Sequence, residues 1–356
     1  MTDFPDMAHH FTWGEVFNQS DRLADERDWD GLVRLYDALD AACADPARLP
    51  SPEDDRELRQ CRGRVARVAV VELPVSRVAD AARILEREFE DGPAHSGALW
   101  EVLAQVRTWQ EVGPHLRHPL LRHLVAHARI LRGEDLTPYL SSPAGGPPSL
   151  EPGAYGGAPL SLAPWEAEFW DAETHAGSAG RSGGAAAVPG LSAVGREGRF
   201  RLPPATGGST PAPTAPEPLV PGAPSYCFVE ISGPVPCEPE QALARFLQGR
   251  PASERPSYAT PVAFAAAYPD LVLALGGSSA YGTVASPALG RMALWRMLRE
   301  FGGLDALAPA ADVSAFVAGL TCLTWELADD EIWFVHLAVG DGRQGVSWII
   351  DGQDID

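Results

Sequence analysis

Three runs of aromatic and β-branched residues, separated by turn-forming residues, stand at the C-terminal end of the chain. They lie between Cys322 and Asp351 and are interrupted by Asp329-Asp330 and by Gly340-Asp341-Gly342. Aromatic and β-branched side chains are typical of strands, and Asp and Gly are typical of the turns between strands. The pattern predicts a three-stranded antiparallel meander.

Apolar residues recur at helical spacing through residues 1–140. One segment carries its apolar residues on a single helical face: Leu32, Leu35, Tyr36 and Leu39. Ser51 followed by Pro52 is a helix start, and Pro74 ends that helix. Further helices are expected over 76–89, 97–111 and 119–132. The pattern predicts an all-α domain, either stacked helical hairpins resembling a short solenoid or a plain bundle.

Residues 141–224 have a different composition, dominated by Gly, Pro, Ser, Ala and Thr. Such a stretch buries too little apolar surface to offset its ordering entropy, so we expect a largely disordered Pro/Gly-rich linker. From 177 to 224 we expect no regular secondary structure. The exception is a segment near 160–170, which contains three large apolar side chains: Trp165, Phe169 and Trp170. We expect this segment to dock on a neighbouring domain.

Strand and helix patterns alternate in residues 225–356. Strands are expected over 225–232 and 270–276, and helices over 239–248 and 312–320. A further helix is expected to begin at Ser286-Pro287 and to end at Gly302-Gly303. With the meander, this region forms one α+β domain, and the fold class of the whole chain is α+β.

Composition excludes several kinds of chemistry. The chain of 356 residues contains no lysine, so all 28 basic residues are arginine. A Walker A loop, a pyridoxal phosphate enzyme and a protein kinase each need a lysine. We therefore predict no such cofactor.

The net charge of −20 argues against a nucleic-acid surface, which needs concentrated positive charge. It is explained either by solubility or by a basic protein partner. No apolar run approaches the roughly 18 residues of a membrane span, and the acidic N-terminus lacks signal-peptide features. The five cysteines are scattered, which favours a reducing compartment. We expect a cytoplasmic protein without membrane contact.

Ser278 lies in a glycine-rich loop, Gly276 to Gly282, between an apolar run and a capped helix. This context suits a nucleophile elbow, although the pattern around Ser278 ends in Ala280 where the usual motif has Gly. A triad would need His336 as base, and Asp312 is one of few acids between Ser278 and His336 that could complete it. The alternative interpretation is a plain connecting loop.

Cys322 is the second candidate nucleophile for His336. If Asp329-Asp330 forms a two-residue turn, Leu323 lies opposite His336 and Cys322 points to the other face of the sheet. We therefore expect a buried Cys322 and a His336 that is hydrogen-bonded at the edge of the core.

His123 and His127 share one face of a predicted helix, where both could bind a metal ion. Zinc needs a third ligand, and no H-E-x-x-H pattern is present. The favoured interpretation is a pair of structural histidines, and no metal site is predicted.

The C-terminal half combines Ala280-Tyr281-Gly282 in a glycine-rich loop, Thr324-Trp325-Glu326 in a strand, and the stretch from Glu331 to His336. In these features, and in residues 120–135 and 162–166, the chain resembles an uncharacterised family of high-GC bacterial proteins, a domain of unknown function. The resemblance implies a helical N-terminal half before an α+β end, and it implies no catalytic residue.

No complete catalytic site is apparent. The sequence therefore favours a non-catalytic, cytoplasmic protein-interaction module, immunity-like or regulatory, that binds a basic protein. The alternative is a hydrolase that uses Ser278 or Cys322 with His336.

Overall fold

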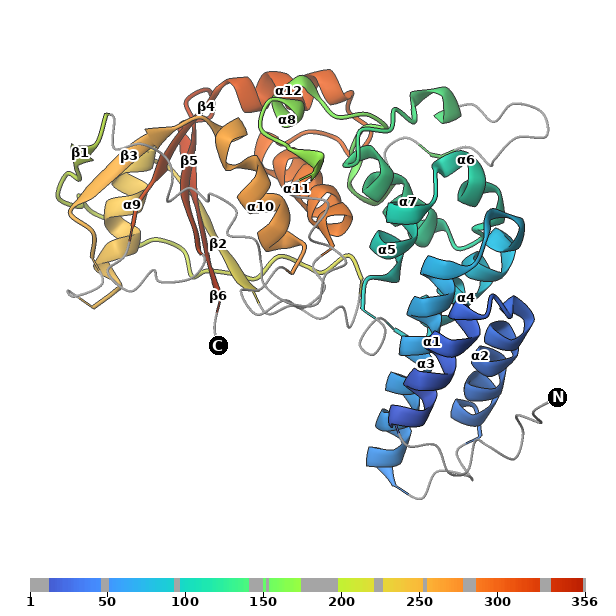
Figure 1. The fold of residues 1–356 in the computed structure, drawn as a ribbon. Helices are drawn as coiled ribbons and strands as arrows, with labels where there is room; N and C mark the ends of the chain where they lie inside the picture. The colour runs from blue at the N-terminus through green and yellow to red at the C-terminus, as the bar shows by residue number, and fades with distance from the viewer. Residues whose placement is uncertain are drawn as a thin grey trace. The chain divides into compact units, whose positions relative to one another are not determined.

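The computed structural model describes residues 13–45, 51–92, 97–140, 150–151, 154–173, 198–220, 227–251, 255–277, 286–326 and 334–354. Contacts divide the chain into two compact units. The first comprises residues 1–129, 138–150 and 220–224, and the second comprises 130–137, 151–219 and 225–356. The fold is α+β, with a mostly helical N-terminal half and an antiparallel sheet in the C-terminal half (Figure 1).

The N-terminal half is built from helices: α1 (Trp13–Asp25), α2 (Trp29–Cys43), α3 (Pro52–Glu72), α4 (Val78–Glu90), α5 (Leu99–Val106), α6 (Trp109–Val112) and α7 (Pro119–Ile130). The long helix α3 contacts α1, α2, α4 and α5, so it is the centre of this unit. Ser51 caps α3 as predicted, because its side chain accepts a hydrogen bond from the Asp54 N–H at 3.2 Å.

One predicted helix is divided in two. The expected helix over 97–111 is interrupted at Arg107, whose backbone is extended, and α6 begins after Thr108. Glu111 accepts a hydrogen bond from the Thr108 N–H at 2.9 Å, which stabilises the start of this second helix.

The second unit contains the sheet and the remaining long helices. Its strands are β1 (Phe200–Arg201), β2 (Cys227–Val235), β3 (Tyr258–Val262), β4 (Leu320–Thr324), β5 (Phe334–Asp341) and β6 (Val346–Asp354), in the antiparallel order β1-β3-β4-β5-β6-β2. Its helices are α8 (Pro164–Ala167), α9 (Pro239–Gln248), α10 (Tyr268–Leu275), α11 (Pro287–Gly302) and α12 (Ala310–Ala318). Among the described residues of both units, short 3-10 helices lie at Val75–Arg77, Gly113–His115, Thr137–Leu140, Ala154–Gly156 and Phe264–Ala267. Strands β4, β5 and β6 are adjacent, which confirms the predicted meander.

The two faces of the sheet belong to different cores. On one face, Cys322, Leu337 and Ile350 pack with side chains of α10, α11 and α12. On the other face, Ala338 and Ile349 pack with side chains of α9. Figure 1 shows α9 on one side of the strands and α10 and α11 on the other.

The strand predicted over 270–276 is wrong, because these residues belong to helix α10. Pro269 occupies the first turn of α10 and Asp270 adds a carboxylate near its positive end. Every residue from Tyr268 to Ala274 is buried, so the helix lacks the polar face that would have revealed its period.

Regular structure also forms where composition predicted none. Phe200 and Arg201 pair with Ala259 and Tyr258 as strand β1. Further along the same stretch, Thr214 pairs with Ile231 at the edge of β2. Backbone pairing on an existing sheet therefore orders part of this Pro/Gly-rich sequence.

The aromatic segment near 160–170 packs within the second unit. The Trp170 indole lies in the core and donates a hydrogen bond to the Leu131 carbonyl at 2.7 Å. Trp165 contacts the rings of Tyr268 and Trp295, at centroid distances of 5.3 and 5.8 Å. Phe169 is 37% exposed.

Within the part of the chain that the structure describes, no helix combines the length and apolar character needed to cross a membrane.

Candidate functional site

His336 and Asp351 face each other across β5 and β6, with 2.7 Å between Nδ1 and Oδ1. Asp351 also forms an ion pair with Arg250. Trp325 stacks on the imidazole at a centroid distance of 5.1 Å and an interplanar angle of 13°. A carboxylate on Nδ1 fixes the tautomer and orientation of a histidine ring, as in a base and its orienting acid. The His336 side chain is only 1% exposed.

Cys322 does not meet His336. Cys322 lies in the core that packs against α10 and α11, whereas His336 lies on the opposite face, beside Trp325. Burial raises the pKa of the Cys322 thiol to about 12, which disfavours the nucleophilic thiolate. The geometry gives this pair no shared reaction site.

The strand register differs from the expected one by two residues. Leu323 lies opposite Ala338 instead of His336, and Cys322 lies opposite Val339. Since side chains alternate with a period of two, this shift keeps Cys322 and His336 on opposite faces.

Ser278 lies outside the described residues, in the stretch 278–285. Asp312, the acid considered for a triad with it, is exposed in the first turn of α12. The carboxylate that contacts His336 is instead Asp351. The pattern of the last two strands could have predicted this pair, because a turn centred between Asp341 and Val346 places His336 opposite Asp351.

His123 and His127 are buried on α7, with their rings stacked at 6.2 Å. Burial, together with the charge of Arg122, lowers the pKa of His123 to about 4, so this ring is neutral at pH 7. Among the described residues, no group of three or more His, Cys, Asp and Glu side chains is placed to hold a metal ion. The contact between the two rings fits a structural role.

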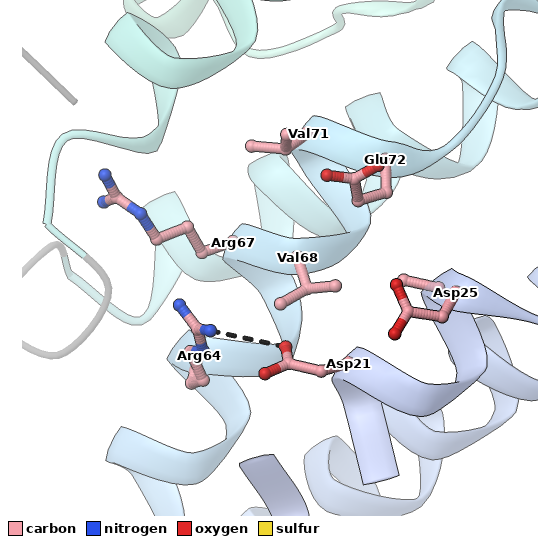
Figure 2. Close-up of a pocket in the computed structure, with 8 residues that line it drawn as sticks. Asp21, Asp25, Arg64, Arg67, Val68, Val71 and Glu72 are labelled. Atoms are coloured by element: carbon pink, nitrogen blue, oxygen red, sulfur yellow. Dashed lines mark hydrogen bonds and ion pairs between the residues drawn. The ribbon is translucent and has the colours of Figure 1, made fainter. Parts of the chain in front are cut away.

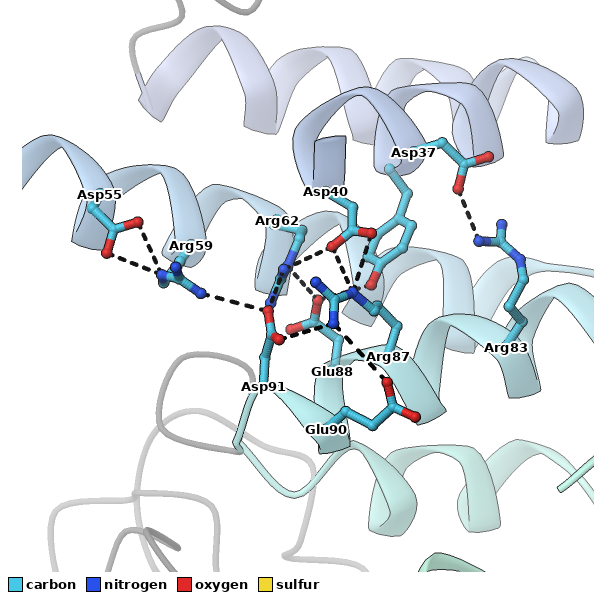
Figure 3. A network of polar contacts seen from close by, with 11 residues as sticks. Asp37, Asp40, Asp55, Arg59, Arg62, Arg83, Arg87, Glu88, Glu90 and Asp91 are labelled. Carbon is cyan, nitrogen blue, oxygen red and sulfur yellow. Dashed lines mark hydrogen bonds and ion pairs between the residues drawn. The ribbon is translucent and has the colours of Figure 1, made fainter. Parts of the chain in front are cut away.

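A buried network of charges joins α2, α3 and α4 (Figure 3). Arg62 of α3 is 1% exposed and contacts Glu88 at 2.7 Å, Asp40 at 2.8 Å and Asp91 at 2.6 Å. The Tyr36 hydroxyl donates to Glu88 at 3.0 Å. Although burial lowers the pKa of Arg62, Glu88 and Asp91 raise it overall, so the guanidinium stays charged. These contacts fix α3 against its neighbours.

A groove of about 460 Å³ lies between α1 and α3 (Figure 2). Its apolar lining is Ala24, Val68 and Val71, and its charged lining is Asp21, Asp25, Arg64, Arg67 and Glu72. The volume falls within the ~300–1,000 Å³ range of ligand pockets. Sequence reasoning missed this site, because it depends on how two helices separated by α2 pack together.

The charges in this groove are unevenly paired. Arg64 forms an ion pair with Asp21 at 3.3 Å. Asp25 and Glu72 are both exposed, and neither forms an ion pair or a side-chain hydrogen bond with a described residue. The groove therefore carries two carboxylates that its own arginines leave uncompensated.

Comparisons with models of protein families, with curated proteins and with solved structures find no match to this chain.

Proposed function

We propose that this protein is a non-catalytic, cytoplasmic interaction module, immunity-like or regulatory, whose partner is a basic protein. The observation that carries the proposal is the groove between α1 and α3, where Asp25 and Glu72 lack a cationic partner among the described residues. The net charge of −20 supports it, because a negative field attracts a basic partner and speeds its association.

The rigidity of α3 adds support. The Arg62 network and the capping by Ser51 hold this helix in place before any partner binds. A preorganised surface loses little conformational entropy on association, which favours binding.

The proposal is tested by affinity purification with the full chain as bait, at about 0.05 M and about 0.5 M salt, a range over which surface charges become screened. We expect a small set of basic proteins that is released by salt. The control bait is an unrelated globular protein of matched net charge. If both baits recover the same proteins, or if the recovered proteins are no more basic than the lysate, the proposal is wrong.

The 2.7 Å contact between His336 and Asp351 favours a second candidate, a hydrolase. In that case Ser278 is the remaining nucleophile, because Cys322 lies on the other face of the sheet. Hydrolysis of an activated acyl ester should then be lost in both Ser278→Ala and His336→Gln. Equal rates for the wild-type protein and both variants would exclude this candidate.

A further inference from the structure

One arginine of the protein itself, Arg64, already lies in the groove between α1 and α3 and contacts a carboxylate and an aromatic ring there. The Arg64 guanidinium pairs with Asp21 and lies over the Phe17 ring, 5.0 Å from the centroid. A carboxylate on one side and an apolar surface on the other are the usual surroundings of a protein-bound guanidinium. This arrangement occupies one end of the groove.

One helical turn further along, the carboxylate is repeated but the cation is not. Asp25 follows Asp21 by one turn of α1, and Val68 follows Arg64 by one turn of α3. Another turn of α3 brings Glu72, a second acid. Figure 2 shows the Arg67 guanidinium directed away from Asp25 and Glu72. The pattern of acid and apolar surface therefore continues without the arginine.

We propose that this part of the groove binds one arginine side chain of the partner protein, an inference that rests on the proposed function. Val68 and Val71 contact the aliphatic part of that side chain, and Asp25 and Glu72 accept hydrogen bonds from its guanidinium. The planar guanidinium has five N–H donors and can bond two carboxylates at once, which the smaller ammonium group of lysine does less well.

The test uses the full chain with labelled valine methyl groups and a blocked heptapeptide that carries one central arginine. We expect the peptide to shift the methyl signals of Val68 and Val71. The matched probe is the same peptide with citrulline in place of the central arginine, because citrulline keeps the shape of arginine but not its charge. A lysine peptide is the third probe and should bind less tightly than the arginine peptide.

The protein variant Asp25→Asn/Glu72→Gln should bind the arginine peptide about tenfold more weakly or worse, as expected when charge-assisted hydrogen bonds are lost. Both side chains are exposed, so the fold should be retained, and circular dichroism checks it. The control is Glu53→Gln/Glu57→Gln, which changes the net charge equally at two exposed sites near the other end of α3. This control should bind as the wild-type protein does.

Three results would overturn the inference: equal binding of the citrulline peptide, unchanged binding by the Asp25/Glu72 variant, or no shift at Val68 and Val71. Equal binding of the lysine peptide would overturn the preference for guanidinium. A basic partner that binds the Asp25/Glu72 variant normally would contradict this inference alone. A failure to recover any basic partner would contradict the proposed function, whatever the peptide does.

Discussion

Glu166 and Arg291 are separated by 125 residues and form a bidentate ion pair in which both side chains are 0% exposed. Arg291 also donates hydrogen bonds to the carbonyls of Pro159 and Ser161, at 3.0 and 2.9 Å. Glu166 accepts a further hydrogen bond from the Trp295 indole at 2.9 Å. Although burial lowers the pKa of Arg291, Glu166 raises it overall, so the guanidinium stays charged. It attaches the segment around α8 to helix α11.

We predict that Glu166→Gln destabilises the second unit by about 3–5 kcal/mol, because it leaves the Arg291 charge buried without its counter-ion. The measurement is urea unfolding followed by tryptophan fluorescence. The control, Glu168→Gln, changes an exposed carboxylate in the same segment and should shift the free energy of unfolding by about 0.5 kcal/mol or less. An equal effect of the two substitutions would show that the pair does not hold this segment.

We predict that Gly290→Ala separates α10 from α11. A Cβ atom at position 290 would lie 1.8 Å from the Val272 carbonyl oxygen, which is backbone and cannot move aside alone. The expected loss of stability is about 1–3 kcal/mol, as for other overpacked cores. Gly342→Ala is the control, since its Cβ would meet nothing within 4 Å. Thermal unfolding of the two variants compares the sites, and similar melting temperatures would contradict the close packing.

The contrast between the meander and α10 shows what the sequence could reveal about the fold. The side chains of strands β4 to β6 alternate between two cores, and Gly342 and Gly345 lie in the turn between β5 and β6, so the pattern has a clear period. Helix α10 is buried on all sides, so its sequence lacks the alternation of apolar and polar residues that would indicate a helix. The cues that remained were Pro269 and Asp270, which are typical of a first helical turn.

The candidate sites were harder to predict, because each depends on residues that packing brings together. His336 was a candidate from sequence, but Asp351 meets it only through strand register, and Asp351 in turn pairs with Arg250, which follows α9. The groove depends on α1 and α3 being neighbours although α2 lies between them in the chain. Helical periodicity predicts that each helix exists but not which helix it contacts.

We predict that His123 makes the protein less stable in mild acid. Its folded-state pKa is lowered from 6.5 to about 4, so the unfolded chain takes up a proton that the folded chain resists. The contribution to stability is therefore complete above pH 6.5 and is lost as the pH falls towards 4. Between pH 7 and 5 the wild-type protein should lose about 2 kcal/mol more than His123→Met does.

Urea unfolding at the two pH values measures this difference. The control is His115→Gln, because His115 is exposed and its replacement should keep the wild-type response to pH. If His123→Met and the wild-type protein lose the same free energy between pH 7 and 5, the ring is not held in its neutral form by burial.

We predict that Cys322 is the least reactive of the described cysteines, which distinguishes a core thiol from a catalytic one. With a pKa of about 12, only about one thiol in 10⁴ is ionised at pH 8, and the side chain is 2% exposed. Cys237 is partly exposed and should react first with iodoacetamide, whereas buried Cys43 and Cys61 should react slowly. Mass spectrometry of timed samples gives the rate at each site, and denatured protein gives the rate without burial.

A catalytic Cys322 would instead be alkylated faster in the folded protein than in the denatured one, since a nucleophile needs both access and a stabilised thiolate. Slow alkylation in the folded state, with recovery on denaturation, is the outcome that burial in the core beside α10 and α11 requires.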